Sequence, residues 1–194
     1  MMTQTQSISF AGGFYDAPVA ASHAFRAAMT AMARPGDIKV IEGAQPPKGL
    51  SVAAGSLLLT LCDPETAIFL ASDVDSPELR GWLTFHTGAP FAPAEKADFA
   101  IGGWEALTPL DQFKIGTAEY PDRSATLVVE MPELSNAGPI LSGPGIKETA
   151  RLSLPSLTEF QGNAQLFPLG LDFFFTSGSQ VAALPRSTSV MAED

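Results

Sequence analysis

The chain has 194 residues and a formal net charge of −10, with 45% hydrophobic and only 16% charged residues. A chain of this length can bury a core that needs no disulfide or metal, and its composition argues against disorder. The surplus of acidic residues opposes binding to nucleic acid and to anionic membranes, so neither is an expected partner.

No segment of the sequence predicts secretion or insertion into a membrane. The first ten residues have no basic stretch before an apolar core, as a signal peptide would. The apolar uncharged run at residues 49–62 is shorter than the roughly 20 residues that span a bilayer. The single cysteine, Cys62, ends this run, where a buried and inert thiol is expected. By elimination we expect a cytoplasmic protein.

Helical and strand patterns alternate along the chain. The first helix is expected to begin at Asp16, its N-cap, and to end near Ala33, before Pro35 and Gly36. Further helices are expected over 48–62, 76–87, 105–113 and 154–165, and strands over 37–42, 67–71, 98–102, 124–131, 136–141, 170–176 and 180–184. This alternation predicts an α/β fold of three layers, α/β/α, with a mixed sheet. We expect one domain over 14–194, preceded by a flexible N-terminus at 1–13.

The first helix has three distinct faces at 100° per residue. Phe25, Met29 and Met32 form an apolar stripe that we expect to face the core. A second face, made of Ala24, Ala27 and Ala31, would let another element approach closely. The polar face, His23, Arg26, Thr30 and Arg34, is either solvated or turned toward a ligand or partner.

Most of the polar side chains with chemical potential lie in five turns marked by proline or glycine. Because such turns hold the backbone at defined points, polar residues on them are candidates for binding. The five turns are Arg34-Pro-Gly-Asp37, Phe85-His-Thr-Gly-Ala-Pro90, Tyr120-Pro-Asp-Arg-Ser124, Ser142-Gly-Pro-Gly145 and Leu184-Pro-Arg-Ser-Thr188.

Three arginines and one histidine in these turns are candidate anion ligands. Arg123 with Ser124, and Arg186 with its neighbouring hydroxyls, combine a guanidinium with hydroxyl groups in a way that suits phosphate or carboxylate oxygens. Arg34 follows the first helix and lies in another of these turns, directly before Pro35. His86 and Thr87 end a helix whose apolar stripe His86 continues, so His86 is either a capping or core side chain or a general base. Each arginine has a structural alternative too, since it could cap strand-end carbonyls or pair with acids.

Motifs for the common kinds of catalysis are missing. The turn at Ser142 lacks the spacing of a phosphate-binding loop, and Pro144 has no N–H to donate. There is no G-x-S-x-G elbow. Two histidines 63 residues apart and one cysteine give no metal-ligand spacing, and no lysine lies in a pyridoxal-phosphate motif. We therefore expect no catalytic residues, no metal and no cofactor.

Eight motifs in this order resemble the PhnH family, the H subunit of the bacterial carbon–phosphorus lyase core complex. Each motif is weak alone, but their common order spans the chain from about residue 14 to 188. They are Phe25-Arg26 with Ala31-Met-Ala-Arg-Pro-Gly36, Leu58-Leu-Thr-Leu-Cys-Asp63, Trp82-Leu-Thr-Phe-His-Thr-Gly88, Ala97-Asp-Phe-Ala100, Gly116-Thr117 with Tyr120-Pro-Asp-Arg-Ser-Ala-Thr126, Ser142-Gly-Pro-Gly-Ile146, Phe167-Pro-Leu-Gly-Leu-Asp172 and Leu184-Pro-Arg-Ser-Thr188.

The resemblance implies a fold, partners and a pathway. The fold would be that of the large domain of pyridoxal-phosphate-dependent transferases, without the cofactor. The partners would be a second copy in a homodimer and the G, I and J subunits of the core complex. With the G, I and L subunits, the family is linked to forming ribose 1-methylphosphonate 5-triphosphate from ATP and methylphosphonate. The resemblance assigns no catalytic residues to this subunit.

Three functional hypotheses remain open from the sequence. The chain is a non-catalytic subunit that docks on the complex, or it contributes Arg34, Arg123, Arg186 and His86 to a shared phosphate or nucleotide site. The third hypothesis is a free-standing small-molecule transferase.

Overall fold

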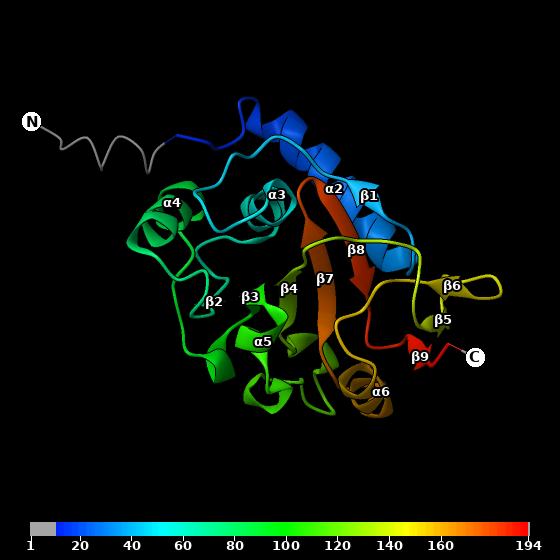
Figure 1. Ribbon diagram of the computed structural model, residues 1–194. Coiled ribbons are helices and arrows are strands. Elements are labelled where there is room, and N and C mark those ends of the chain that lie inside the picture. The colour runs from blue at the N-terminus through cyan, green and yellow to red at the C-terminus, as the bar shows by residue number, and fades with distance from the viewer. Residues whose placement is uncertain (1–10, 194) are drawn as a thin grey trace, which may run out of the picture.

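A mixed sheet of six strands forms the middle of the computed structural model, which describes residues 11–193 (Figure 1). Its strands are β1 (Lys39–Val40), β2 (Ile68–Leu70), β3 (Phe99–Gly103), β4 (Thr126–Glu130), β7 (Asp172–Ser177) and β8 (Gln180–Leu184). Their order is β1-β8-β7-β4-β3-β2. The strands β2, β3, β4 and β7 run parallel, while β8 and β1 are antiparallel to their neighbours. Side chains on both faces of the parallel strands are buried, as the continuous apolar run in β4 predicts.

Helices α2 (Ala17–Ala33), α3 (Val52–Leu61) and α4 (Pro77–Thr87) cover one face of the sheet. Leu57 and Leu58 of α3 are fully buried against strand residues of this face, as expected from the apolar run. In α4, Leu79, Trp82 and Leu83 are buried, which confirms the predicted stripe. Ser76 caps this helix through the Leu79 N–H, and Gly88 ends it in the left-handed conformation.

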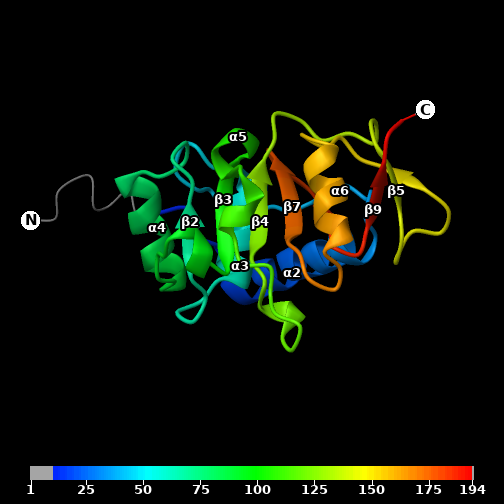
Figure 2. The same cartoon turned by 90° about the horizontal axis from the view of Figure 1, so that it is seen from below.

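The other face of the sheet is covered by α5 (Trp104–Leu107), α6 (Thr158–Gln165) and a second, three-stranded sheet. That sheet contains β5 (Ile140–Ser142), β6 (Ala150–Arg151) and β9 (Ser189–Met191), in the order β6-β5-β9. Figure 2 shows α2 and α3 on one side of the strands and α5 and α6 on the other. An α/β fold with a mixed sheet is therefore confirmed. Three 3₁₀ turns are also present: η1 (Ala94–Lys96), η2 (Leu110–Gln112) and η3 (Pro121–Arg123).

The predicted core face of the first helix was wrong. Phe25 and Met29 are 48% and 54% exposed, although Met32 is partly buried. The residues that enter the core are alanines, Ala24, Ala28 and Ala31. Small side chains occupy the buried face because α2 packs closely on both α3 and β8, and large side chains would hold these elements apart. The Asp16 carboxylate makes no capping hydrogen bond, although the helix begins next to it.

Two other predicted helices are shorter than the sequence suggested, and a predicted strand is displaced. The helix expected over 105–113 is a short α5 followed by the separate turn η2, because Thr108 precedes Pro109 and has an extended backbone. The helix expected from 154 begins only at Thr158, after Pro155. The strand expected over 136–141 is β5, which belongs to the small sheet and not to the main one.

The described part of the N-terminal segment, residues 11–13, contacts the helical layer. The Trp82 indole N–H donates to the Ala11 carbonyl at 3.0 Å, and the Gln45 N–H donates to the Gly12 carbonyl at 2.7 Å. Residues 1–10, which the expected flexible N-terminus includes, lie outside the described residues. Among residues 11–193, no helix is long and apolar enough to cross a membrane.

Candidate functional site

Four of the five turns are linked by successive contacts that run from the end of α2 to the turn before β4. A Cβ added to Gly145 would lie 2.0 Å from the Ala33 carbonyl oxygen, and one added to Gly143 would lie 3.0 Å from the Ser187 carbonyl oxygen. The turn at 142–145 therefore packs directly on the end of α2 and on the segment between β8 and β9. The segment at 187–188 also belongs to the turn of Arg186, whose side chain reaches the turn at 120–124. Only the turn at 85–90 lies elsewhere, at the end of α4.

Arg186 is the centre of a nearly buried polar cluster. Its guanidinium pairs with the Asp172 carboxylate at 2.5 Å, and the exposed fractions of the two side chains are 13% and 22%. It also donates to the Pro121 carbonyl at 2.5 Å and to the Ser124 hydroxyl. Three chain segments, the start of β7, the turn η3 and the end of β8, are held together by this one side chain. The hydrogen-bonding groups of Arg186 and Ser124 are thus engaged within the chain, which leaves few of them to bind a ligand.

The side chains of Arg123 and Arg34 differ from that of Arg186, because they are exposed and have no ion pair or hydrogen bond within residues 11–193. The Arg123 guanidinium lies over the Tyr120 ring, 4.0 Å from its centroid. Arg34 follows the last residue of α2, and its backbone N–H donates to the Thr30 carbonyl. Arg123 lies in the same turn as Ser124, whereas Arg34 lies at the end of α2, in the turn whose Gly36 packs on Ala150. The three arginines are therefore not gathered around one ligand position.

His86 and Thr87 lie apart from the arginines, at the end of α4. The half-buried His86 ring packs edge-on against Trp82 and Phe85, at centroid distances of 5.1 and 4.9 Å. Burial lowers the pKa of His86, and a hydrogen bond to the Ala11 backbone opposes that shift. The Thr87 hydroxyl donates to the Leu83 carbonyl at 2.7 Å and accepts from the Ala89 N–H at 3.0 Å. This environment is that of a helix end closed by the N-terminal segment.

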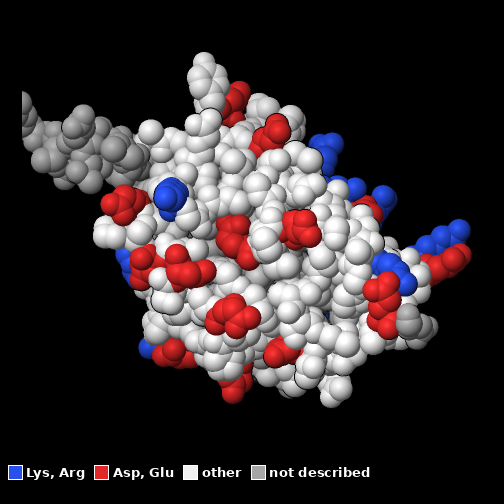
Figure 3. Space-filling view, in the orientation of Figure 1, with Lys and Arg blue, Asp and Glu red and all other residues white. Residues whose placement is uncertain are grey.

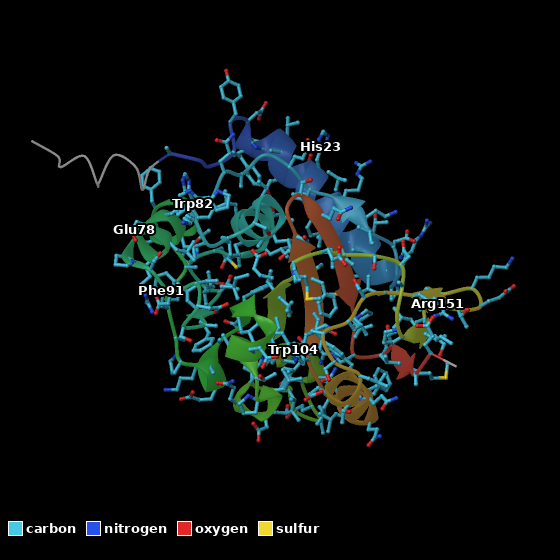
Figure 4. All side chains as sticks on the ribbon, in the orientation of Figure 1. His23, Glu78, Trp82, Phe91, Trp104 and Arg151 are labelled. Carbon is cyan, nitrogen blue, oxygen red and sulfur yellow. The ribbon has the colours of Figure 1, made fainter. Side chains whose placement is uncertain are left out.

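Figure 4 makes the separation of these groups visible. Trp82, which contacts His86, is labelled at one end of the molecule, and Arg151 of β6 is labelled at the other. A polar cavity of about 650 Å³ lies beside Arg151, between β6 and the turn after α2. Its charged groups already pair, Lys39 with Asp37 at 2.8 Å and Arg151 with Glu193. Among the described residues, no group of three or more His, Cys, Asp or Glu side chains is placed to hold a metal ion.

The sequence analysis missed Glu130, at the carboxyl end of β4. Ligands of open α/β sheets usually bind at the carboxyl ends of the strands. The half-buried Glu130 carboxylate accepts the N–H of Ser51, the N-cap of α3, at 2.7 Å. Burial raises the pKa of Glu130, and the nearby Asp73 carboxylate raises it further, while the hydrogen bonds from Ser51 and Thr176 oppose the shift. The sequence signal that could have identified Glu130 is an acidic residue at the end of an apolar, β-branched strand.

Asp73 lies at the same edge, and its carboxylate also accepts a backbone hydrogen bond. It follows β2, and its carboxylate accepts the N–H of Gly103, at the end of β3, at 2.7 Å. Two carboxylates at this edge repel a phosphate, so the edge is unsuited to an anionic ligand. On the face shown in Figure 3, acidic side chains are spread across the middle, and most lysine and arginine side chains lie toward its rim.

The comparisons with known proteins agree with the order of the turn motifs. The sequence pattern of the family described as "Bacterial phosphonate metabolism protein (PhnH)" matches residues 12–191. The chain belongs to the PhnH family. The resemblance expected from the eight motifs is thereby confirmed, and it covers both the sheet and the cluster of turns.

Two relatives show what is known for members of the family. The chain is 39% identical over 197 residues to the "Alpha-D-ribose 1-methylphosphonate 5-triphosphate synthase subunit PhnH" of Rhizobium meliloti (strain 1021), covering 97% of this chain and 98% of the relative. It is 29% identical over 178 residues to the "Putative C-P lyase subunit protein HtxG" of Stutzerimonas stutzeri, covering 86% of this chain and 84% of that protein. Both relatives are named as subunits.

Proposed function

We propose that the chain is the H subunit of a carbon–phosphorus lyase core complex and takes part in phosphonate catabolism. In this role it helps to form ribose 1-methylphosphonate 5-triphosphate from ATP and methylphosphonate, together with the G, I and L subunits. The observation that carries the proposal is the 39% identity, over nearly the full length of both chains, to a protein named as this subunit.

Within that complex, the chain acts in assembly and not in catalysis. The polar side chains that could have done chemistry are engaged by the chain itself: Arg186 by Asp172, Thr87 by α4, and Glu130 by α3. The remaining candidates, Arg34, Arg123 and His86, lie in three separate places, so they do not surround one substrate. Arg34 and Arg123 keep open the alternative of a phosphate-binding contribution, since neither guanidinium has an ion pair within residues 11–193.

The proposal includes partners, a location and a fold relationship. The partners are a second copy of this chain and the G, I and J subunits, all in the cytoplasm. Apolar side chains exposed on α2 and on the edge strand β1, among them Phe25, Met29 and Val40, support a role as a bound subunit. A mixed sheet with four parallel strands and helices on both faces supports a relationship to the large domain of pyridoxal-phosphate-dependent transferases.

Genetic complementation tests the proposal. A strain that lacks its own H subunit and carries this gene should grow with methylphosphonate as its phosphorus source, and equally well on inorganic phosphate. Growth on inorganic phosphate alone, with the protein present at normal levels, would contradict the proposed function.

A further inference from the structure

A preformed apolar groove lies between η2 and α6, on the face of the sheet opposite α2. It has a volume of about 440 Å³, and its apolar lining includes Leu110, Phe113, Ile115 and Leu166. The Asn163 side chain fixes α6 against the segment before β7, because its amide donates to the Leu171 carbonyl at 2.9 Å and accepts the Leu171 N–H at 2.8 Å. The groove therefore exists in the free chain and does not require a ligand to form.

A glycine in the middle of α6 opens onto this groove. Gly162 is the fifth residue of the eight-residue helix Thr158–Gln165, where alanine would be more stable by about 1 kcal/mol. A Cβ at this position would meet no atom of the chain within 4 Å. Gly55 of α3 is different, since a Cβ there would lie 2.8 Å from the Pro46 ring. The chain's own packing explains Gly55, but it does not explain Gly162, whose missing side chain leaves room for something outside the chain.

The charge around the groove indicates which kind of occupant fits. Asp111 and Glu159 are exposed members of its lining, and the lining contains no lysine or arginine. Glu159 accepts a hydrogen bond from the Ser156 hydroxyl. Two carboxylates beside an apolar floor attract a group that is apolar at its end and positively charged next to it. An anionic substrate such as a phosphonate or a triphosphate is repelled.

We propose that the groove between η2 and α6 docks a partner polypeptide of the complex. The partner inserts an apolar side chain against Gly162, and an adjacent lysine or arginine pairs with Asp111 or Glu159. This inference rests on the proposed function, because it supplies the surface through which the chain joins the other subunits. A buried anchor of this kind carries most of the affinity of an interface.

The first test blocks the groove without disturbing the fold. Gly162→Trp fills the groove, and Thr84→Trp places the same ring on the exposed side of α4 as a matched control. Each full-length variant is co-expressed with the other subunits, and its incorporation is measured by size-exclusion chromatography. We expect Gly162→Trp to reduce incorporation about tenfold or more, with an unfolding temperature no lower than that of Thr84→Trp, which should incorporate as the wild type does.

Three outcomes of this test bear differently on the inference and on the proposed function. Equal incorporation of the wild type and of Gly162→Trp would overturn the groove as a docking site and leave the proposed function standing. A wild-type chain that does not enter the complex at all would remove both. Loss of self-association by Gly162→Trp, with normal incorporation, would assign the groove to a second copy and also overturn the inference.

A second test identifies the occupant and does not depend on a bulky substitution. Cys62 is 7% exposed and burial raises the pKa of its thiol, so Gly162→Cys supplies the reactive cysteine. A photoreactive maleimide attached there should cross-link, within the complex, to a peptide of another subunit that has an apolar residue next to lysine or arginine. A cross-link to this chain itself, to a peptide without a basic neighbour, or to nothing in an intact complex would contradict the proposal. Thr84→Cys, labelled in the same way, is the control and should give no such cross-link.

Discussion

At the scale of single residues, the arginines of this chain fall into two kinds. Arg186 makes an ion pair with the start of β7 and hydrogen bonds with the turn η3 and Ser124, and its side chain is 13% exposed. Arg123 instead lies on the surface over Tyr120. The sequence alone could not separate them, because both follow a proline closely and both have hydroxyl neighbours. What separates them is the carboxylate of Asp172, which only the fold brings to Arg186.

Replacing Arg186 should therefore damage stability before it affects any ligand. Arg186→Met leaves the Asp172 carboxylate without its partner in a mostly buried position, and we expect a loss of about 3 kcal/mol in the free energy of unfolding. Arg123→Met removes only a surface contact, with an expected loss below about 1 kcal/mol. Urea denaturation of both variants measures this difference. Equal losses would show that the interactions of Arg186 with Asp172 and the turn η3 do not stabilise the fold.

Glu130 should make stability depend on pH in an unusual direction for a carboxylate. Burial raises its pKa in the folded state above the ordinary value of 4.5. Well below that value both states are protonated, so the residue has no effect on the difference between them. As the pH rises through 4.5, the unfolded state loses its proton first, and stability is lost until the folded-state pKa has been passed.

The variant Glu130→Gln removes this titration but keeps an oxygen that accepts the Ser51 N–H. We expect the variant to gain stability relative to the wild type between pH 4 and pH 7, so that its free energy of unfolding exceeds that of the wild type by more at pH 7 than at pH 4. Urea denaturation at the two pH values provides the comparison. A relative stability that is constant or that falls between pH 4 and pH 7 would show that Glu130 is not destabilised by its burial.

At the scale of elements, most helices and strands could be predicted, but the faces and partners of some could not. The helix at 77–87 followed from its Ser76 cap, its apolar stripe and Gly88, which are all local signals. Local signals also located β4 and the hairpin of β7 and β8. The buried face of α2 was mistaken because hydrophobicity favours Phe25 and Met29, whereas the close approach of α3 and β8 requires alanine.

Long-range pairing was the second limit of the sequence. β5 and β9 are separated by about 50 residues. Neither has an alternation of apolar and polar residues long enough to predict that the two strands pair in a separate sheet. The candidate site had the same limit. Proline-marked turns indicated loops that carry polar side chains, but the groove between η2 and α6 is lined by segments around residues 110 and 162 that have no common motif.

Two glycines within helices, Gly55 and Gly162, should respond oppositely to the same substitution. Gly162→Ala should raise the free energy of unfolding by about 0.5–1 kcal/mol, because alanine favours the helix and its Cβ meets no neighbour. Gly55→Ala should lower it by about 1–3 kcal/mol, since the added Cβ would press on Pro46. Thermal or urea unfolding measures both. A Gly162→Ala variant that is less stable than the wild type would mean that the chain itself needs this glycine.

At the scale of the whole molecule, the charge distribution favours a subunit over an enzyme for anionic substrates. The chain carries a net charge of −10, and carboxylates lie at the carboxyl edge of its sheet. A phosphate site on such a surface would need several arginines turned toward one point. The two exposed candidates, Arg34 and Arg123, belong to different turns.

Removal of both exposed arginines tests the alternative of a shared phosphate site. We expect the double variant Arg34→Ala and Arg123→Ala to support growth on methylphosphonate as the wild-type gene does, because neither charge is needed for assembly. Growth rate in the complemented deletion strain is the measurement. Loss of growth, while the variant still enters the complex, would favour a direct role of these side chains in binding the substrate.

The most direct measurement of the central claim is product formation by purified proteins. Ribose 1-methylphosphonate 5-triphosphate is measured after ATP and methylphosphonate are incubated with this chain alone, with the other synthase subunits alone, and with all of them together. We expect product only from the complete set, because we propose that this chain acts by joining the other subunits. Product formed by the chain alone would contradict the account.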